Sequence, residues 1–158
     1  MKPRNMALAA LFISLSAIGG MLKIPLGVAS IALDAMPALV AALFLSAPLA
    51  GVVAALGHLA SALYGGFPLG PFHAMIAFEM GLAVWLFTKM HKDGRRNVKW
   101  IAFVLGNGVV AAIPFYFLLS PAFFYAAVPG LLAASGINAL GAGAIMPFME
   151  KRLREGVK

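Results

Sequence analysis

The chain has no cysteine, and long stretches of it carry no charge. Without cysteine there are no disulfides, no thiolate metal ligands and no cysteine nucleophile. Residues 100–149 contain no Asp, Glu, Lys or Arg, and residues 24–88 contain only Asp34 and Glu79. The G-x-x-x-x-G-K-[ST] motif of P-loops is missing, as are H-E-x-x-H and G-x-S-x-G. These absences exclude ATP binding through a P-loop and argue against a protease or hydrolase.

Hydrophobic residues are what the chain has in abundance: 63% of its 158 residues, against 11% charged. Several apolar stretches approach or exceed the roughly 18 residues that mark a membrane-spanning helix. The length allows about six such helices in one domain, residues 1–158. The first twenty residues have the basic start of a signal peptide, but more membrane sequence follows, which favours a retained first helix. The sequence predicts an all-α polytopic membrane protein.

Six helices are expected, and three prolines suit their first turns. The predicted helices cover about residues 5–22, 35–46, 48–64, 71–90, 99–119 and 129–149. A missing N–H costs nothing in a first helical turn, where Pro48, Pro71 and Pro129 are placed. Pro114 falls inside the fifth helix and is expected to kink it.

The basic residues predict the orientation in the membrane. Eleven of the twelve Lys and Arg residues lie at helix ends that six crossings place on one side. They are Lys2, Arg4, Lys89, Lys92, Arg95, Arg96, Lys99, Lys151, Arg152, Arg154 and Lys158. The positive-inside rule makes this side cytoplasmic, with both termini inside. Topology and anionic lipid therefore explain the net charge of +7 better than nucleic acid does.

The loops expected on the outer side, residues 23–33, 65–70 and 120–128, are apolar or aromatic. The second helix is short if Asp34 caps it, because twelve residues rise only about 18 Å. A hydrocarbon core of about 30 Å then leaves the preceding segment partly at membrane depth, packed on protein. Such a loop is either a lid over a pocket or ordinary packing.

The polar side chains inside this apolar chain gather at similar depths. Five of the six helices contribute to a set in the outer half or the middle of the membrane: Asp34, His58, His73, Glu79, Asn107 and Asn138. Such convergence is expected of an outward-facing site for a small molecule. A carboxylate as deep as Glu79 must be neutralised, paired or bound to a ligand, which makes function the default interpretation.

The other polar residues each have a structural alternative. Asp34 serves equally as the N-cap of the second helix, and His73 as an interfacial histidine in water. His58, Asn107 and Asn138 are also explained as hydrogen-bonding groups between helices. Lys23 either extends to the outer interface or pairs with Asp34.

A stripe of small residues, Ala7, Ala10, Ser14 and Ala17, recurs on the first helix at spacings of three and four. Small residues let another helix approach closely, either inside the bundle or from a partner subunit.

Residues 24–73, and above all "ALDAMPALVAALFLSAPLAGVVAALGHL", resemble the S component of an energy-coupling factor (ECF) vitamin transporter. The small-residue stripe and the apolar first outer loop add to the resemblance, which covers nearly the whole chain. The stretch "GGFPLGPFH" looks most like the S component for α-ribazole, the nucleoside of dimethylbenzimidazole used in cobalamin salvage.

The resemblance implies a multi-pass subunit of a prokaryotic plasma membrane that is not an enzyme and uses no cofactor. It would bind a vitamin near the outer face, close its first outer loop over it, dock on a T component with two ATPases, and topple to release it. The family docks through an A-x-x-x-A pattern; the corresponding stretch here, Ala10 to Ser14 within the stripe, is small-x-x-x-small with serine in place of the second alanine. Metal-transporting members carry histidine after the initiator Met; Lys2 here argues against a metal.

For α-ribazole, the residues suggest a division of roles. Tyr64, Phe67 and Phe72 would enclose the base. Asp34, Glu79, Asn107 and Asn138 would bond the ribose hydroxyls, and His58 or His73 the base nitrogen. Three alternatives stay open: an S component for another vitamin or a queuosine-type precursor, a divalent-metal transporter or channel using His58, His73, Asp34 and Glu79, and a structural membrane subunit.

Overall fold

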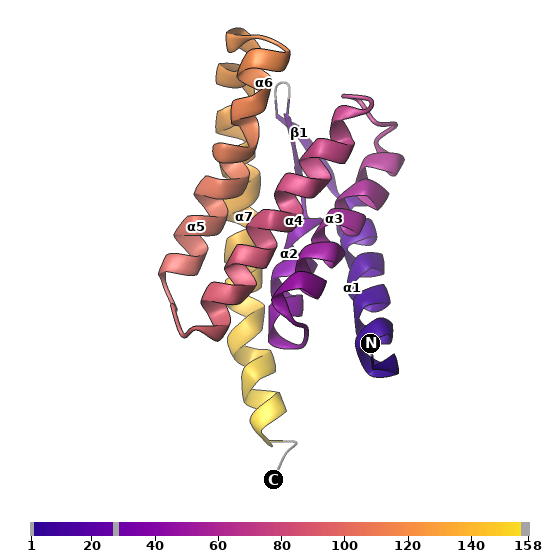
Figure 1. Ribbon diagram of the computed structural model, residues 1–158, viewed down its shortest axis with the longest axis vertical. Helices are drawn as coiled ribbons and strands as arrows, with labels where there is room; N and C mark the ends of the chain where they lie inside the picture. Colours follow the sequence, from indigo (N-terminus) through magenta and orange to yellow (C-terminus); the bar gives the residue numbers. More distant parts are fainter. Residues whose placement is uncertain (1, 27–28, 156–158) are drawn as a thin grey trace.

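The computed structural model describes residues 2–26 and 29–155, which form an elongated bundle of helices (Figure 1). Its long helices are α1 (Pro3–Met21), α3 (Ala47–Tyr64), α4 (Phe72–Lys92) and α7 (Pro121–Glu155). α1 begins and α7 ends at the same end of the bundle, the lower end in Figure 1. The predicted all-α fold is confirmed, with a short β-hairpin added to it.

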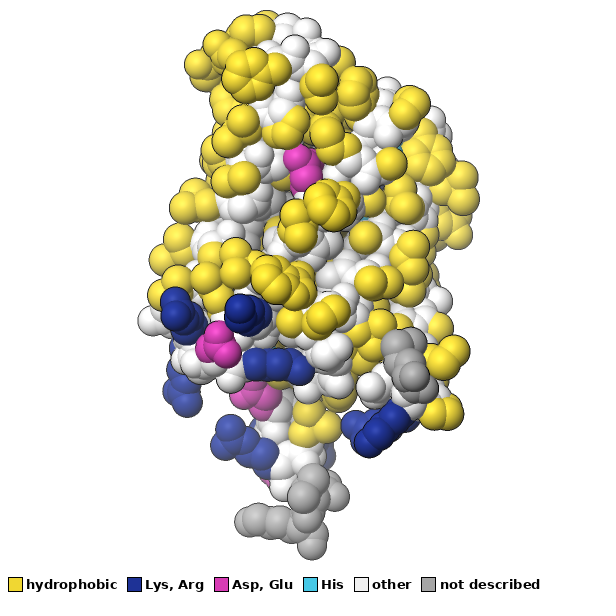
Figure 2. Space-filling model, viewed as in Figure 1, with side chains coloured by type: hydrophobic (Ala, Val, Ile, Leu, Met, Phe, Trp, Pro, Cys, Tyr) yellow, Lys and Arg dark blue, Asp and Glu magenta, His cyan; other side chains and the backbone are white. Residues whose placement is uncertain are grey.

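The surface is suited to lipid. Four stretches of the described chain are long and apolar enough to cross a membrane: Pro3–Met21, Ala47–Tyr64, Val98–Leu118 and Pro121–Glu155. Large apolar side chains such as Phe78, Phe117 and Leu140 are more than 60% exposed. Figure 2 shows hydrophobic side chains over most of the visible face. In water such a surface would aggregate, whereas hydrocarbon accommodates it.

Basic side chains gather at one end of the molecule. In Figure 2 they occupy the lower part of the face, where α1 begins and where α4 and α7 end. The described Lys and Arg residues that the sequence grouped on one side thus lie at one end of the bundle. By the positive-inside rule this is the cytoplasmic end.

The second helix is buried and too short to cross a membrane. α2 (Ala35–Val40) continues into the 3₁₀ turn η1 (Ala41–Leu43), and Ala38, Leu39 and Ala41 have no exposed surface. α1, α3, α4 and α7 all contact α2. The structure ends this helix sooner than the predicted range 35–46. Neighbouring helices, not lipid, surround it, so its incomplete span leaves no backbone groups in hydrocarbon.

The fifth predicted helix is interrupted, as expected from Pro114. α5 (Val98–Gly108) gives way to the 3₁₀ turn η2 (Val110–Ala112), and α6 (Ile113–Leu118) starts with Pro114 in its first turn. Proline cannot donate to the carbonyl of residue 110 and its ring clashes with it, so the α-helical ladder breaks there.

The last helix starts earlier than the sequence predicted, at Pro121 instead of Pro129. Pro129 lies inside α7, and the expected outer loop 120–128 is mostly helical. The overlooked start signal is the pair Ser120–Pro121. The Ser120 Oγ accepts a hydrogen bond from the Phe123 N–H at 3.1 Å, as an N-cap does, and proline follows in the first helical position.

The first outer loop is a hairpin and not an irregular segment. β1 (Lys23–Leu26) pairs antiparallel with β2 (Ala29–Ala32), placing Lys23 opposite Ala32 and Ile24 opposite Ile31. β2 packs on α7. The Leu33 N–H that follows it donates to the Gly19 carbonyl at 3.2 Å. Strand pairing satisfies the backbone polar groups of an apolar segment near membrane depth.

Candidate functional site

A cavity of about 210 Å³ lies among the hairpin, α3, α4, the α5–α6 segment and α7. Residues from the end of α3, the start of α4 and the first half of α7 line it. These segments lie away from the basic end of the bundle, so the cavity is in the outer half of the molecule. Its volume is below the roughly 300–1,000 Å³ that is typical of ligand pockets.

Five of the nine residues predicted to bind substrate line this cavity: Asp34, His58, His73, Asn107 and Asn138. They come from the start of α2 and from α3, α4, α5 and α7 in turn. Residues that are 24 to 104 positions apart in the sequence from Asp34 thus reach one space. Whether they contact a substrate stays a prediction.

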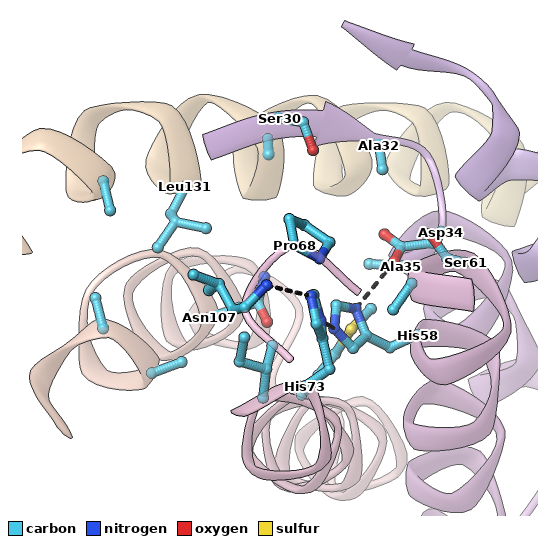
Figure 3. A pocket seen from close by; sticks show the side chains of 18 of the residues that line it. Ser30, Ala32, Asp34, Ala35, His58, Ser61, Pro68, His73, Asn107 and Leu131 are labelled. Carbon is cyan, nitrogen blue, oxygen red and sulfur yellow. Dashed lines mark hydrogen bonds and ion pairs between the residues drawn. The ribbon is translucent and has the colours of Figure 1, made fainter. Parts of the chain in front are cut away.

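Asp34, His58 and His73 form a continuous chain of polar contacts (Figure 3). The Asp34 Oδ2 lies 3.2 Å from the His58 Nδ1, and the His58 Nε2 lies 3.3 Å from the His73 Nδ1. At the far end the Leu69 N–H donates to the His73 Nε2 at 3.5 Å. Asp34 and His73 are both 8% exposed. A buried carboxylate is thereby paired, and both nitrogens of each imidazole have partners.

Asp34 occupies the N-cap position of α2 but its side chain makes no capping bond within the described chain. The cap comes from α7, because the Asn138 Oδ1 accepts a hydrogen bond from the Met36 N–H at 2.7 Å. The Asn138 Nδ2 donates to the carbonyls of Ala32 and Ala134 at 2.7 and 2.9 Å. The side-chain amide of Asn138 therefore bonds backbone groups of the protein itself. Because Asn138 caps α2, the Asp34 carboxylate can bond His58 instead.

The Asn107 side chain makes fewer hydrogen bonds within the described chain than the Asn138 side chain does. Its Nδ2 donates to the Ser135 Oγ at 2.9 Å, which joins α5 to α7. Among the hydrogen bonds of the described residues, none uses the Asn107 Oδ1. This amide oxygen is available as an acceptor for a ligand donor.

The other four predicted substrate residues are not among the described residues that line the cavity. Tyr64 is 63% exposed at the end of α3. Phe67 and Phe72 stand behind the lining, where Phe67 packs edge-on against His73 and Phe72 against Phe115, with ring centroids 5.5 and 5.7 Å apart. They therefore shape the wall from behind.

Glu79 is also outside the lining, although its neighbours Ile76 and Met80 on α4 belong to it. Its Oε2 is buried and has no hydrogen-bond partner within the described chain. His58 and His73 bond each other and Asp34, so neither histidine is paired with Glu79.

The aromatic wall comes from elsewhere in the chain. Phe115 on α6 and Phe123 on α7 line the cavity, and their ring centroids are 6.0 Å apart. The run "PFYFLLSPAFF", residues 114–124, carries the signal that could have identified them, since its aromatic residues flank an outer turn.

The sequence reasoning assigned no substrate role to three further polar residues of the lining, Lys23, Ser30 and Ser61. The Lys23 Nζ donates to the Ser61 carbonyl at 2.9 Å. Lys23 thus ties the hairpin to the end of α3, instead of pairing with Asp34.

The residues of the alternative metal site are not arranged around one ion. Within residues 2–26 and 29–155, no three His, Asp or Glu side chains are arranged to hold a metal ion. The alternative of a divalent-metal site at His58, His73, Asp34 and Glu79 gains no support from the geometry.

The small-residue stripe of α1 faces outward. Ala7, Ala10 and Ser14 are exposed and Ala17 is half-buried, whereas the buried positions of α1 are Ala9, Phe12, Ser16 and Gly20. The Ser14 Oγ bonds the Ala10 carbonyl of its own helix at 3.0 Å. Internal packing therefore does not explain the stripe.

Comparison with known proteins adds a family and a fold. The family model described as "ECF transporter, substrate-specific component" matches residues 4–155. The fold is similar to a solved structure titled "Structure and mechanism of the S component of a bacterial ECF transporter", with a TM-score of 0.68 and 16% identity. That alignment covers 100% of this chain and 99% of the other. No curated protein sequence matches the chain significantly.

Proposed function

Since the chain belongs to the family of ECF transporter substrate-specific components, we propose that the cavity described above holds the substrate of an importer. The single observation that carries this is the convergence of Asp34, His58, His73 and Asn107 on one cavity in the outer half of an otherwise apolar bundle. Polar groups at membrane depth are costly and are retained where a ligand uses them.

The substrate we propose is α-ribazole. Its flat aromatic base suits the wall formed by Phe115 and Phe123, which packs well against a ring face. Its ribose hydroxyls suit the polar residues of the lining, among them His73 and Asn107, whose Oδ1 is available as an acceptor. The resemblance of "GGFPLGPFH" to the S component for α-ribazole supports the same choice.

The hairpin is the proposed lid over the site. Lys23 of β1 and both Ser30 and Ala32 of β2 line the cavity, so moving the hairpin opens it. The Lys23 bond to the Ser61 carbonyl is a latch that closure forms and opening breaks. This gives a route for substrate from the outer side without unfolding a helix.

Transport requires partners, which we propose are a T component and two ATPases. Members of this family are substrate-binding subunits, and this chain carries no P-loop of its own. The exposed stripe Ala7, Ala10, Ser14 and Ala17 is the proposed contact with the T component, because small side chains permit close helix approach.

Calorimetric titration of the purified chain in detergent tests the substrate directly. α-Ribazole is expected to bind tightly at one to one, while riboflavin, thiamine and cobalt give no heat of binding. Binding of riboflavin or thiamine instead would assign another vitamin. A cobalt signal would restore the metal-transport alternative. A folded protein that binds none of the four would refute α-ribazole as the substrate.

A further inference from the structure

We propose that Asp34, His58 and His73 form a hydrogen-bond relay with a single direction, ending at His73 in an acceptor that selects a ligand donating an O–H or N–H group. The inference rests on the proposed function in one respect, namely that the substrate occupies this cavity. It adds what that proposal lacks: which kind of chemical group the site recognises, and why it rejects the opposite kind.

The direction follows first from the Leu69 end. A backbone N–H can only donate, so the His73 Nε2 that it contacts at 3.5 Å is a bare nitrogen. A neutral imidazole with a bare Nε2 carries its proton on Nδ1. The His73 Nδ1–H then donates across 3.3 Å to the His58 Nε2, which is bare in turn. His58 therefore also carries its proton on Nδ1.

The Asp34 end independently gives the same order. An ionised carboxylate only accepts, so the His58 Nδ1 that lies 3.2 Å from its Oδ2 must donate. The His58 Nε2 is then bare, the His73 Nδ1 must donate to it, and the His73 Nε2 is again bare. With the opposite tautomers, a bare His58 Nδ1 would face the Asp34 carboxylate, lone pair against lone pair. The His73 Nε2–H would face the Leu69 N–H, donor against donor. Both ends thus fix one pair of tautomers.

The ligand donor is expected at the His73 Nε2, where it would replace the Leu69 N–H. The contact from the Leu69 N–H is long for an N–H donor, so it is weak. Leu69 lies between α3 and α4, next to Gly70 at φ 53°, and lines the cavity together with His73. A hydroxyl or N–H of the ligand that approaches the His73 Nε2 replaces this weak bond with a stronger one. A ligand carbonyl, carboxylate or phosphate oxygen there meets a lone pair.

The charges around the relay favour an uncharged ligand. With neutral histidines, the described lining side chains with formal charge are Lys23 and Asp34, of opposite sign. Lys23 donates to the Ser61 carbonyl, and Asp34 accepts from His58. Glu79 is near on α4 but outside the lining. A neutral, hydroxyl-rich molecule such as a nucleoside matches this balance.

The tautomers are measurable without any ligand, by long-range ¹H–¹⁵N correlation on ¹⁵N-histidine protein. The chain has three histidines, and His91 is an internal reference. Its Nδ1 accepts from the Lys99 Nζ at 2.7 Å, which leaves its proton on Nε2. We expect two imidazoles protonated on Nδ1 and one on Nε2, assigned by the signal that His58→Phe, His73→Phe or His91→Phe removes.

The spectrum decides the relay whatever the substrate is. An Nε2–H tautomer or an imidazolium at His58 or His73, at the pH of the binding assay, would overturn it. In Asp34→Asn the side-chain amide both donates and accepts, so one end no longer imposes an order. The weak Leu69 contact alone then holds the order, so a population of the Nε2–H tautomer of His58 is expected to appear beside the Nδ1–H form. An unchanged Nδ1–H pattern in this variant would show that Asp34 does not direct the relay.

The ligand arm uses α-ribazole and its three monodeoxy ribose analogues. One analogue is expected to bind the wild-type chain about tenfold more weakly than α-ribazole does, and to bind His73→Phe as well as α-ribazole does. Equal losses in both proteins would overturn the acceptor role of His73. If α-ribazole does not bind at all, the proposed substrate fails, while the relay is still decided by the histidine spectrum.

Discussion

The Asn138 Oδ1 accepts a hydrogen bond from the Met36 N–H at 2.7 Å, across 102 positions of sequence. The residue at the N-cap of α2 is Asp34, yet its carboxylate bonds His58 instead. The Asn138 side chain on α7 thus caps α2 in place of Asp34, and the Asp34 carboxylate is free to line the cavity. The cap, the hairpin and the relay are coupled, because Asn138 also holds the Ala32 carbonyl of β2.

Asn138→Leu is therefore expected to destabilise the protein strongly. It leaves the Met36 N–H and the Ala32 carbonyl unpaired inside the bundle, at roughly 1–3 kcal/mol for each buried group. Asn107→Leu is the matched control, since it breaks one bond, to Ser135. Thermal unfolding in detergent should show a clearly larger drop in midpoint for Asn138→Leu. Equal drops would mean that the cap of α2 is unimportant.

A close crossing of α3 and α4 gives a second stability prediction. A Cβ added to Gly51 would lie 2.8 Å from the Gly81 carbonyl oxygen, whereas a Cβ at Gly136 of α7 meets nothing within 4 Å. Gly51→Ala is expected to destabilise by about 1–3 kcal/mol because backbone must move. Gly136→Ala should stabilise by up to about 1 kcal/mol, the difference in helix propensity. Both are read from thermal unfolding, and a stable Gly51→Ala would contradict the tight crossing.

The polar part of the site was predictable because polar residues are conspicuous in membrane helices. Counting depth along six crossings grouped Asp34, His58, His73, Asn107 and Asn138, and the structure brings these five to one cavity. Depth along a helix does not show which way a side chain points, so the residues that face the cavity could not be predicted. Glu79 has the right depth, but its neighbours Ile76 and Met80 face the cavity in its place.

The aromatic part was not predictable by the same route. Pro129 looked like a helix start, which removed the residues before it from the last helix, whereas Ser120 caps α7 and Phe123 lies in its first turn. The long-range cap by Asn138 has no local signal either, since its partner Met36 is on another helix. Both depend on how the helices pack, which periodicity alone does not give.

Asp34→Asn is expected to weaken substrate binding more than Glu79→Gln does. Asp34 lines the cavity and is hydrogen-bonded to His58, whereas Glu79 is outside the lining. Calorimetry with α-ribazole on both variants makes the comparison, and substitutions in the cytoplasmic segment 93–97 should leave the affinity unchanged. A loss for Glu79→Gln as large as for Asp34→Asn would place Glu79 against the ligand.

Glu79→Gln also carries a stability prediction of its own. Its Oε2 is buried without a partner in the part of the chain that the structure describes. A neutral amide costs less to bury than a carboxylate. The thermal midpoint should stay equal or rise without ligand, and a lower midpoint would show that the carboxylate has a stabilising contact.

Shortening the hairpin should speed ligand release. Removing residues from the segment 25–30 shortens the strands that carry Ser30 and leaves the latch at Lys23 without support. The dissociation rate of α-ribazole is expected to rise at least about tenfold with little change in association, as is usual when contacts are lost. Stopped-flow kinetics measures both rates. The same off-rate in the shortened chain would mean that the hairpin is not a lid.

A bulky side chain on the outer stripe of α1 should separate transport from binding. Ala10→Phe or Ser14→Phe blocks close approach of another helix, but neither residue lines the cavity among the described residues. Uptake of labelled α-ribazole by cells that also carry the T component and the ATPases is expected to fall severely, while the affinity of the purified chain is unchanged. Leu15→Phe is the matched control, because Leu15 is exposed on a different face of the same helix. Full uptake by Ala10→Phe, or an equal loss in Leu15→Phe, would place the docking contact elsewhere.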